Sequence, residues 1–340
     1  MKFEQITVLI GLILSLIACQ SPKTKVITPA FYHWQHKVSL SEMEKQALIE
    51  LKVQKMYVHF FDVDWDEAEQ KTVALATIYG ELESLRNQKI IPSVFITNRC
   101  IAACSDSLVG DLAEKIRGKI AGIAEKYQLK IEEIQLDCDW SEKTGAKYFE
   151  LLKKVKQISP ALPQISATIR LHQVKYFKKT GVPPVDRGML MFYNVADVRN
   201  NTTQNSILDW KEAEKYLQNF DTYPLALDVA LPIFSWGVVT RYGKLVNLLT
   251  GFSLNERNQA FFTQIAENQY KVIKSHYENG VYLYSDDVIR IEKVAAADLE
   301  KAQAKLFPLI KNTEMTVSFF DLSELNLRNH SISGLKNLLN

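Results

Sequence analysis

Short apolar segments recur along the chain, and stretches with helical periodicity separate most of them. Strands that alternate with helices predict a parallel sheet, because a crossover must carry the chain back to the start of the next strand. The expected strands cover residues 30–34, 56–64, 90–98, 131–139, 164–172, 188–194, 223–232 and 315–322, and the expected helices cover 41–51, 67–86, 108–127, 144–158, 210–219 and 295–311.

Eight such strands in about 310 residues fit a single (β/α)8 barrel, the TIM barrel of the α/β class. No linker rich in Pro, Gly or Ser divides residues 29–340, so we expect one domain. Two alternating runs within residues 269–292, joined by Asn279-Gly280, predict a small β-hairpin inserted between the seventh and eighth strands. The excursion would also include the loop-rich segment 234–255. A doubly wound open sheet is the alternative fold.

Residues 1–18 have the features of a signal peptide. Lys2 precedes an apolar run over residues 6–17, which is too short to span a bilayer as a mature helix. The run ends in LIAC, which resembles the bacterial lipobox, in which cleavage precedes a lipid-carrying cysteine. The resemblance implies lipidation of Cys19, a tether over residues 19–28 and attachment to the bilayer in the cell envelope, with the outer membrane as the expected location. An ordinary secretory signal is the alternative.

Composition points away from several other classes. A net charge of +2 without runs of like charge gives no reason to expect a nucleic acid partner. The sequence has no P-loop, GxGxxG, HxH or HExxH motif, so we expect neither a cofactor nor a metal. Cys100 and Cys104 could form a disulfide outside the cytoplasm, whereas Cys138 is expected to pack as a small apolar residue. Nothing in the sequence indicates an oligomeric state.

The fourth expected strand ends in IQLDCDW, which places Asp137 and Asp139 on one face. Carboxylates two residues apart on a strand are separated by roughly 7 Å, close enough to raise each other's proton affinity. The carboxyl ends of the strands form the active face of a barrel. We therefore expect Asp137 and Asp139 to be catalytic, with Asp62 and Asp64 of the second strand as further acids.

The other strand ends are polar and aromatic, a combination that commonly holds sugars. Arg170 has a structural alternative, as an ion-pair partner of Asp137 or Asp139. Asp321 has a sufficient explanation as a helix cap. The residues expected to bind the substrate are His33, Trp34, Trp140, Arg170, His172, Tyr193, Asn194, Asp228 and Trp236.

The fourth and sixth strands resemble those of the family 18 glycoside hydrolases, the chitinase-type barrels. Asp137 and Asp139 match the last two aspartates of that family's DxxDxDxE motif, and Trp140 matches its usual aromatic residue. The segment MFYN, residues 191–194, matches Met-x-Tyr-Asp with Asn in place of Asp. The family's proton-donating Glu falls on Ser141, so its substrate-assisted mechanism is not expected. Non-catalytic relatives also lack this Glu.

The segments FFDVDW and RGMLMFYN further resemble hypothetical lipoproteins of polysaccharide-using Bacteroidetes. Three functions fit these residues, so the sequence leaves open whether the protein is an enzyme. The first is a glycosidase in which Asp139 works with Asp62, Asp64 or Asp228 as the acid. The second is a barrel that binds a glycan or cell-wall fragment without turnover. The third is a metal-dependent hydrolase, whose ligands would be His33, Asp62, Asp64, Asp137 and His172.

Overall fold

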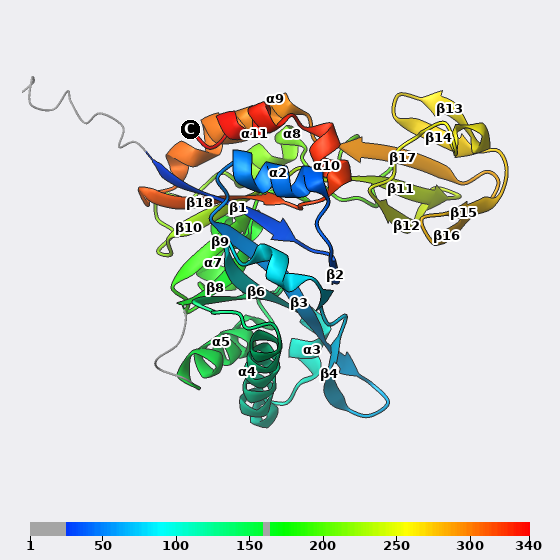
Figure 1. The fold of residues 1–340 in the computed structure, drawn as a ribbon. Coiled ribbons are helices and arrows are strands. Elements are labelled where there is room, and N and C mark those ends of the chain that lie inside the picture. Colours follow the sequence, from blue (N-terminus) through cyan, green and yellow to red (C-terminus); the bar gives the residue numbers. More distant parts are fainter. Residues whose placement is uncertain (1–24, 159–163) are drawn as a thin grey trace, which may run out of the picture.

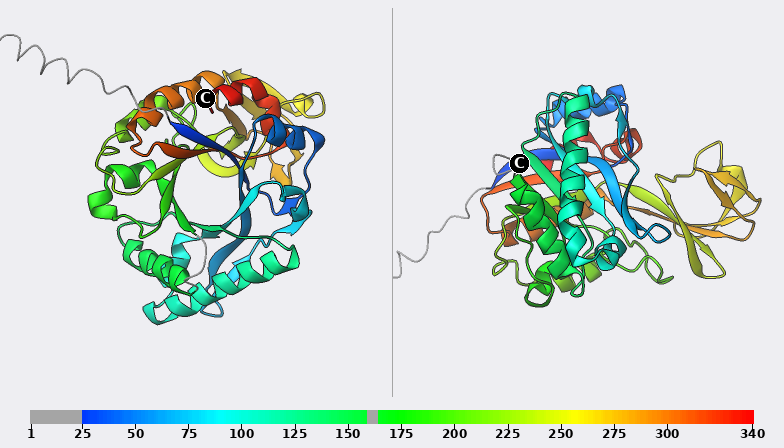
Figure 2. Two further views of the ribbon diagram at one scale, coloured as in Figure 1. Left: turned by 60° about the vertical axis from the view of Figure 1, so that its left-hand side comes forward. Right: turned by 90° about the horizontal axis from the view of Figure 1, so that it is seen from below.

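The computed structural model describes residues 25–158 and 164–340, and these residues contain a closed barrel of eight parallel strands. Figure 2 shows the barrel end-on. The first strand is hydrogen-bonded to both the second and the last strand of the barrel, which confirms the predicted barrel and excludes an open sheet. In order around the barrel the strands are β1 (Val26–His33), β3 (Lys55–Asp66), β6 (Lys89–Ile96), β7 (Glu133–Asp137), β8 (Gln164–Arg170), β9 (Arg187–Met191), β10 (Leu227–Pro232) and β18 (Glu314–Phe320).

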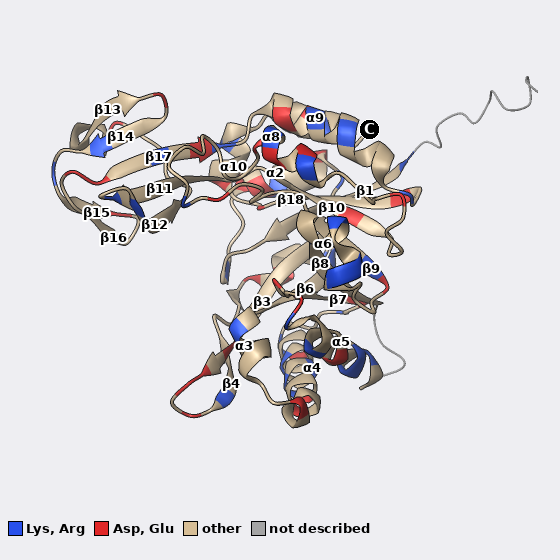
Figure 3. Ribbon diagram, turned by 180° about the vertical axis from the view of Figure 1, so that it is seen from behind, with Lys and Arg blue, Asp and Glu red and all other residues tan. Residues whose placement is uncertain are grey.

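Helices cover the outside of the barrel (Figure 1). The first of them, α2 (Glu42–Glu50), begins at a capping box, in which Ser41 Oγ accepts from the Glu44 amide and the Glu44 carboxylate accepts from the Ser41 amide. Charged residues of both signs lie along α4, α5 and α9 (Figure 3). The remaining helices are α3 (Asn98–Ala103), α4 (Val109–Lys126), α5 (Gly145–Gln157), α6 (Leu171–Lys175), α7 (Phe177–Thr180), α8 (Trp210–Ala213), α9 (Ala296–Leu306), α10 (Glu324–Asn329) and α11 (Ile332–Asn337).

The helix predicted over residues 67–86 is wrong. Asp66 Oδ1 accepts from the amides of Ala68 and Glu69 and closes a turn. Gln70 then adopts a positive φ of 49°, which is incompatible with a helix. The chain returns as β4 (Lys71–Leu75), antiparallel to the long end of β3. Only a 3-10 turn at Leu82–Leu85 remains of the predicted helix, and the short strands β2 (Lys37–Val38) and β5 (Tyr79–Gly80) pair nearby.

The insertion between β10 and β18 is larger than the predicted hairpin. It contains a five-stranded antiparallel sheet with its own apolar core, and the segment expected to be loop-rich supplies two of these strands. Asn279 and Gly280, with φ of 47° and 79°, join two further strands in the turn that a two-residue hairpin requires. The insertion strands are β11 (Ser235–Arg241), β12 (Lys244–Thr250), β13 (Phe262–Ala266), β14 (Gln269–Val272), β15 (His276–Glu278), β16 (Val281–Leu283) and β17 (Val288–Lys293).

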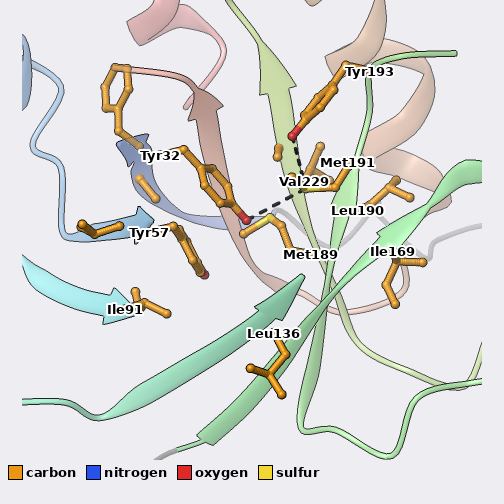
Figure 4. Packing of buried hydrophobic residues seen from close by; sticks show 14 of the residues in the cluster. Tyr32, Tyr57, Ile91, Leu136, Ile169, Met189, Leu190, Met191, Tyr193 and Val229 are labelled. Carbon is orange, nitrogen blue, oxygen red and sulfur yellow. Dashed lines mark hydrogen bonds between the residues drawn. The ribbon is translucent and has the colours of Figure 1, made fainter. Parts of the chain in front are cut away.

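Side chains fill the barrel interior. Tyr32 and Tyr57 stack with ring centroids 4.9 Å apart, and Tyr32 Oη donates to Gln135 Oε1 at 2.6 Å. Figure 4 shows the hydroxyls of Tyr32 and Tyr193 converging on the sulfur of Met191, at 4.0 and 3.7 Å. The barrel is therefore a packed core, and any ligand must bind above it at an end of the strands.

Three expectations concern the chain termini and the cysteines. The signal peptide and Cys19 lie outside the described residues, and β1 already begins at Val26, within the segment assigned to the tether. No helix among the described residues has the length and apolarity needed to cross a bilayer. Cys100 and Cys104 are buried free thiols, so the possible disulfide is not formed. Cys138 is buried, as expected.

Candidate functional site

A pocket of about 660 Å³ lies at the carboxyl ends of the barrel strands, with one wall supplied by the insertion. Its position is the one that parallel barrels use for ligands, because the loops that follow the strands meet there. The residues that line it are Trp34, Gln35, Phe95, Asp137, Asp139, Arg170, Tyr193, Asn194, Phe234, Trp236, Thr250, Gly251, Phe320, Asp321, Ser323, Leu325 and Asn326.

Asp137 forms the floor of this pocket. Its side chain is buried, and Thr168 Oγ1 donates to Asp137 Oδ1 at 2.5 Å. Burial raises the pKa of Asp137, the guanidinium of Arg170 lowers it, and the charge of Asp139 raises it again, so the net shift is upward. The predicted closeness of Asp137 and Asp139 thus has an electrostatic consequence, although burial contributes more.

Asp139 stands higher in the pocket, with 56% of its side chain exposed. Arg170 Nε donates to Asp139 Oδ1 at 2.5 Å, and the guanidinium carbon lies 5.8 Å from the centre of the Tyr193 ring. Arg170 therefore forms the ion pair with Asp139 that the sequence analysis gave as the structural alternative. It also lines the pocket. Its Nη1 is buried and has no hydrogen-bond partner among the described residues.

Asp321 is the residue that the sequence interpretation missed. It follows β18 and lines the pocket, and Asn326 Nδ2 donates to its Oδ1 at 2.6 Å. Burial raises the pKa of Asp321 from its usual value to about 6. The cap of the following helix is Ser323, whose Oγ accepts from the Asn326 amide, so Asp321 is not needed for capping. Its place at the end of the eighth strand was the available signal.

Aromatic rings form the walls. Phe320 lies at the centre, with ring centroids 5.0 Å from Tyr193, 5.5 Å from Trp34 and 5.8 Å from Phe234. Trp236, on the insertion, packs against Phe234 at 5.4 Å. These rings form one continuous apolar surface beside the carboxyl groups.

A buried ion pair orients the indole of Trp236. Its Nε1 donates to Glu292 Oε2 at 2.8 Å, and Arg290 Nε donates to the other oxygen of Glu292 at 2.7 Å. Ser206 also donates to this carboxylate. Because every partner lies outside the pocket, the exposed part of the ring is free for a ligand.

Trp140 does not have the predicted role. Its side chain is only 1% exposed and stacks on Tyr148 with ring centroids 5.4 Å apart. Its Nε1 donates to the Thr180 carbonyl at 3.3 Å. A sugar cannot reach this ring, so Trp140 positions the loop after β7 by packing.

The two acids proposed on the second strand are not brought into the pocket. His59 Nε2 lies 2.7 Å from Asp62 Oδ1. Arg99 Nε donates to Asp64 Oδ1 at 2.7 Å, and this pairing holds the pKa of Asp64 well below its usual range. A carboxyl in such an ion pair cannot serve as a proton donor near neutral pH, so the prediction for Asp64 is wrong.

Two expected substrate-binding residues lie elsewhere. Asp228 is buried near the amino end of β10, where Arg187 donates to both of its oxygens at 2.6 and 2.9 Å. His33 is buried on the side of β1 opposite Tyr32, which faces the barrel interior. Burial lowers the pKa of His33 to about 4. Both predictions are wrong, because a strand pattern does not reveal depth within the barrel or the face that points inward.

A second hollow, of about 460 Å³, adjoins the pocket and shares Asp139, Arg170, Tyr193 and Asn194 with it. His172 lines only this hollow. Ser141, at the position of the family's Glu, also lies here, and its Oγ is 3.2 Å from Thr144 Oγ1 at the start of α5. Ser141 therefore belongs to a local turn and lines the second hollow rather than the main pocket.

The metal hypothesis finds no support in the arrangement of side chains. Within residues 25–158 and 164–340, no three His, Cys, Asp or Glu side chains are grouped closely enough to hold a metal ion. The five ligands named for it are separated, since His33 lies outside the barrel interior and Asp64 is paired with Arg99.

The sequence matches no family model and no curated protein. The structure is similar to the spore cortex-lytic enzyme SleL of Bacillus cereus, with a TM-score of 0.56 and 13% identity over 93% of this chain and 74% of that one. It is also similar to the family 18 chitinase ChiB of Flavobacterium johnsoniae, with a TM-score of 0.53 and 13% identity over 94% of both chains.

A third similar structure is the family 18 chitinase of Cycas revoluta in complex with (GlcNAc)3, with a TM-score of 0.55 and 11% identity over 91% of this chain and 99% of that one. At such identities the similarity establishes the fold alone. The chain therefore has a (β/α)8 barrel fold like those of these three proteins.

Proposed function

We propose that the protein is a membrane-anchored glycosidase that cleaves a glycan with Asp321 as the general acid and Asp139 as the base or nucleophile. The observation that carries this proposal is the combination, in one pocket, of aromatic walls with carboxyl groups in different electrostatic environments. Rings such as Trp34 and Trp236 can pack on the apolar face of a sugar, while the carboxyl groups accept from its hydroxyls.

The two carboxyl groups have separate roles because their surroundings differ. Asp321 has a pKa of about 6, so much of it remains protonated in mildly acidic solution and can donate a proton to the leaving oxygen. Asp139 is paired with Arg170 and stands exposed to the ligand. Since Ser141 stands at the position of the family's Glu and carries no carboxyl group, the proton must come from another residue, and Asp321 supplies it.

Hydrolysis of a panel of oligosaccharides and polysaccharides, followed from about pH 4.5 to pH 8, tests the proposal. We expect product from at least one glycan, with kcat/KM falling about tenfold per pH unit above about pH 6, because ionised Asp321 has no proton to donate. A rate that stays constant from pH 5 to pH 8 would exclude Asp321 as the acid.

A glycan-binding barrel without turnover is the second candidate. The ion pair between Arg170 and Asp139 favours it, because this contact occupies one oxygen of the carboxylate. So does Ser141 in place of the family's Glu. Binding to an oligosaccharide array with no product from any member of the panel, and unchanged binding by Asp139→Asn, would establish this function instead.

The lipobox-like sequence supports attachment to the outer membrane through Cys19. We expect the wild-type protein to incorporate labelled palmitate and to sediment with membranes, and Cys19→Ala to lose both properties because the acceptor thiol is absent. Ser21→Ala is the matched control and should behave like the wild type. Equal labelling of Cys19→Ala would point to the ordinary secretory signal.

A further inference from the structure

Three tyrosines on the hairpin of the insertion form an exposed aromatic strip. Tyr277 and Tyr282 are opposite each other on β15 and β16, with ring centroids 4.9 Å apart. Tyr284 lies two residues further on, 4.8 Å from the Tyr282 ring. Their side chains are 74%, 40% and 50% exposed, in that order. Single exposed aromatic residues are common on protein surfaces, but three rings in contact form a continuous patch.

The strip is not required for packing, because the insertion has a separate core that includes Val239, Phe252 and Phe262. It is nevertheless held firmly. Buried Asp287 accepts from the Tyr284 amide at 2.9 Å and pairs with Arg241 at 2.7 and 2.9 Å. The guanidinium of Arg241 in turn lies 4.1 Å from the centre of the Tyr284 ring. A surface fixed in this way loses little conformational entropy when it binds a ligand.

We propose that Tyr277, Tyr282 and Tyr284 form a second binding site, for an uncharged polysaccharide, and that this site holds the polymer whose units enter the pocket. A tyrosine offers an apolar face with a hydroxyl at its edge, which matches the apolar faces and peripheral hydroxyls of a sugar chain. The choice of ligand rests on the proposed function of the pocket.

The charges around the strip favour a neutral ligand. Arg241 is paired with Asp287, and Lys271 is paired with Asp286 at 2.7 Å. Acidic and basic residues both occur on the insertion (Figure 3). The pairing of Arg241 and Lys271 with aspartates reduces the attraction of this surface for anionic lipid headgroups.

Strand β11 connects the strip to the pocket. Strand β11 carries Trp236, which lines the pocket, at one end and Arg241, which contacts the strip, at the other. Four residues of extended strand lie between them, so the two positions are roughly 17 Å apart. Figure 1 shows the hairpin of β15 and β16 toward the outer part of the insertion, away from the barrel. A polymer, but not a single sugar, could contact both sites.

The test compares the wild type with the triple variant Tyr277→Ala, Tyr282→Ala, Tyr284→Ala in native gels that contain laminarin, xylan, galactomannan or glycol chitin. We expect at least one polymer to retard the wild type and the triple variant to bind that polymer at least tenfold more weakly. Its affinity and turnover for a trisaccharide of the same sugar should be unchanged. Tyr79→Ala, which removes an equally exposed ring outside the insertion, is the matched control.

Thermal unfolding checks that the triple variant is folded. If the triple variant does not fold, the single variant Tyr277→Ala is used in its place, and we expect it to bind the polymer about threefold more weakly than the wild type. Equal retardation of variant and wild type overturns the proposal, as does a wild type that none of the polymers retards. Binding only to phosphatidylglycerol vesicles overturns it as well. Failure of the proposed function of the pocket would give a different result. The wild type would still be retarded by the polymer but would not hydrolyse any glycan.

Discussion

The variant Asp321→Asn is expected to hydrolyse its glycan about 100- to 10,000-fold more slowly than the wild type, which is the usual contribution of a positioned general acid. Asn is close to Asp in shape and can still accept from Asn326 Nδ2, so binding of the oligosaccharide should change little. The effect should therefore appear in kcat rather than in KM. Initial rates and product titrations measure the two separately.

Glu142→Gln is the matched control, since it removes an exposed carboxyl group beside the position of the family's Glu. It should retain full activity. If Glu142→Gln lost activity and Asp321→Asn kept it, the acid would be Glu142, and the loop after β7 would have to rearrange when substrate binds.

The shifted pKa of Asp321 gives a readout that does not depend on turnover. Its pKa rises from 3.8 to about 6 on folding, so the folded state holds the proton more tightly. The resulting contribution to stability is fully present below about pH 4 and is lost as the pH rises through about 6. Asp321→Asn has no such titration. Its free energy of unfolding relative to the wild type should therefore increase between about pH 4 and pH 7, and a constant difference would contradict the assigned pKa.

The barrel could be predicted because each of its strands is a short apolar run with its own local signal, and every observed barrel strand overlaps the predicted one. The failures occur where pairing between segments overrides a local pattern. Residues 67–86 contain many helix-favouring side chains, yet β3 extends far enough to pair with β4. The segment 234–255, expected to be loop-rich, likewise forms β11 and β12 through antiparallel pairing within the insertion.

The candidate site, like the fold, contains residues that local sequence patterns predict and residues that they do not. Asp137, Asp139, Arg170 and Tyr193 could be predicted, because alternation and strand ends place them. The wrong predictions fail on partners that no local pattern displays, as for the ion pair of Asp64 with Arg99, 35 residues away. Asp321 was missed for the opposite reason, because an aspartate after a strand has an ordinary explanation and only burial reveals its raised pKa.

Asp228 is a further residue whose role depends on an ion-pair partner, Arg187, and breaking this ion pair is expected to lower the stability of the protein strongly. Replacing Arg187 with Met would leave the Asp228 carboxylate, which is 2% exposed, without its cation. Removing one partner of a buried ion pair strands the other charge, and because Arg187 is itself 24% exposed we expect a loss of about 2–3 kcal/mol. Urea unfolding of Arg187→Met against the wild type measures it.

The ion pair of Arg99 with Asp64 provides the comparison, because the Arg99 side chain is 64% exposed and water can replace it. Arg99→Met should cost only about 0–1 kcal/mol. The double variant of Arg187→Met with Asp228→Asn should recover part of the lost stability, since Asn still accepts from the Thr316 amide without carrying a charge. If Arg187→Met instead unfolded like the wild type but bound its glycan weakly, Asp228 would belong to the binding site after all, and the barrel would need a ligand path to its amino end.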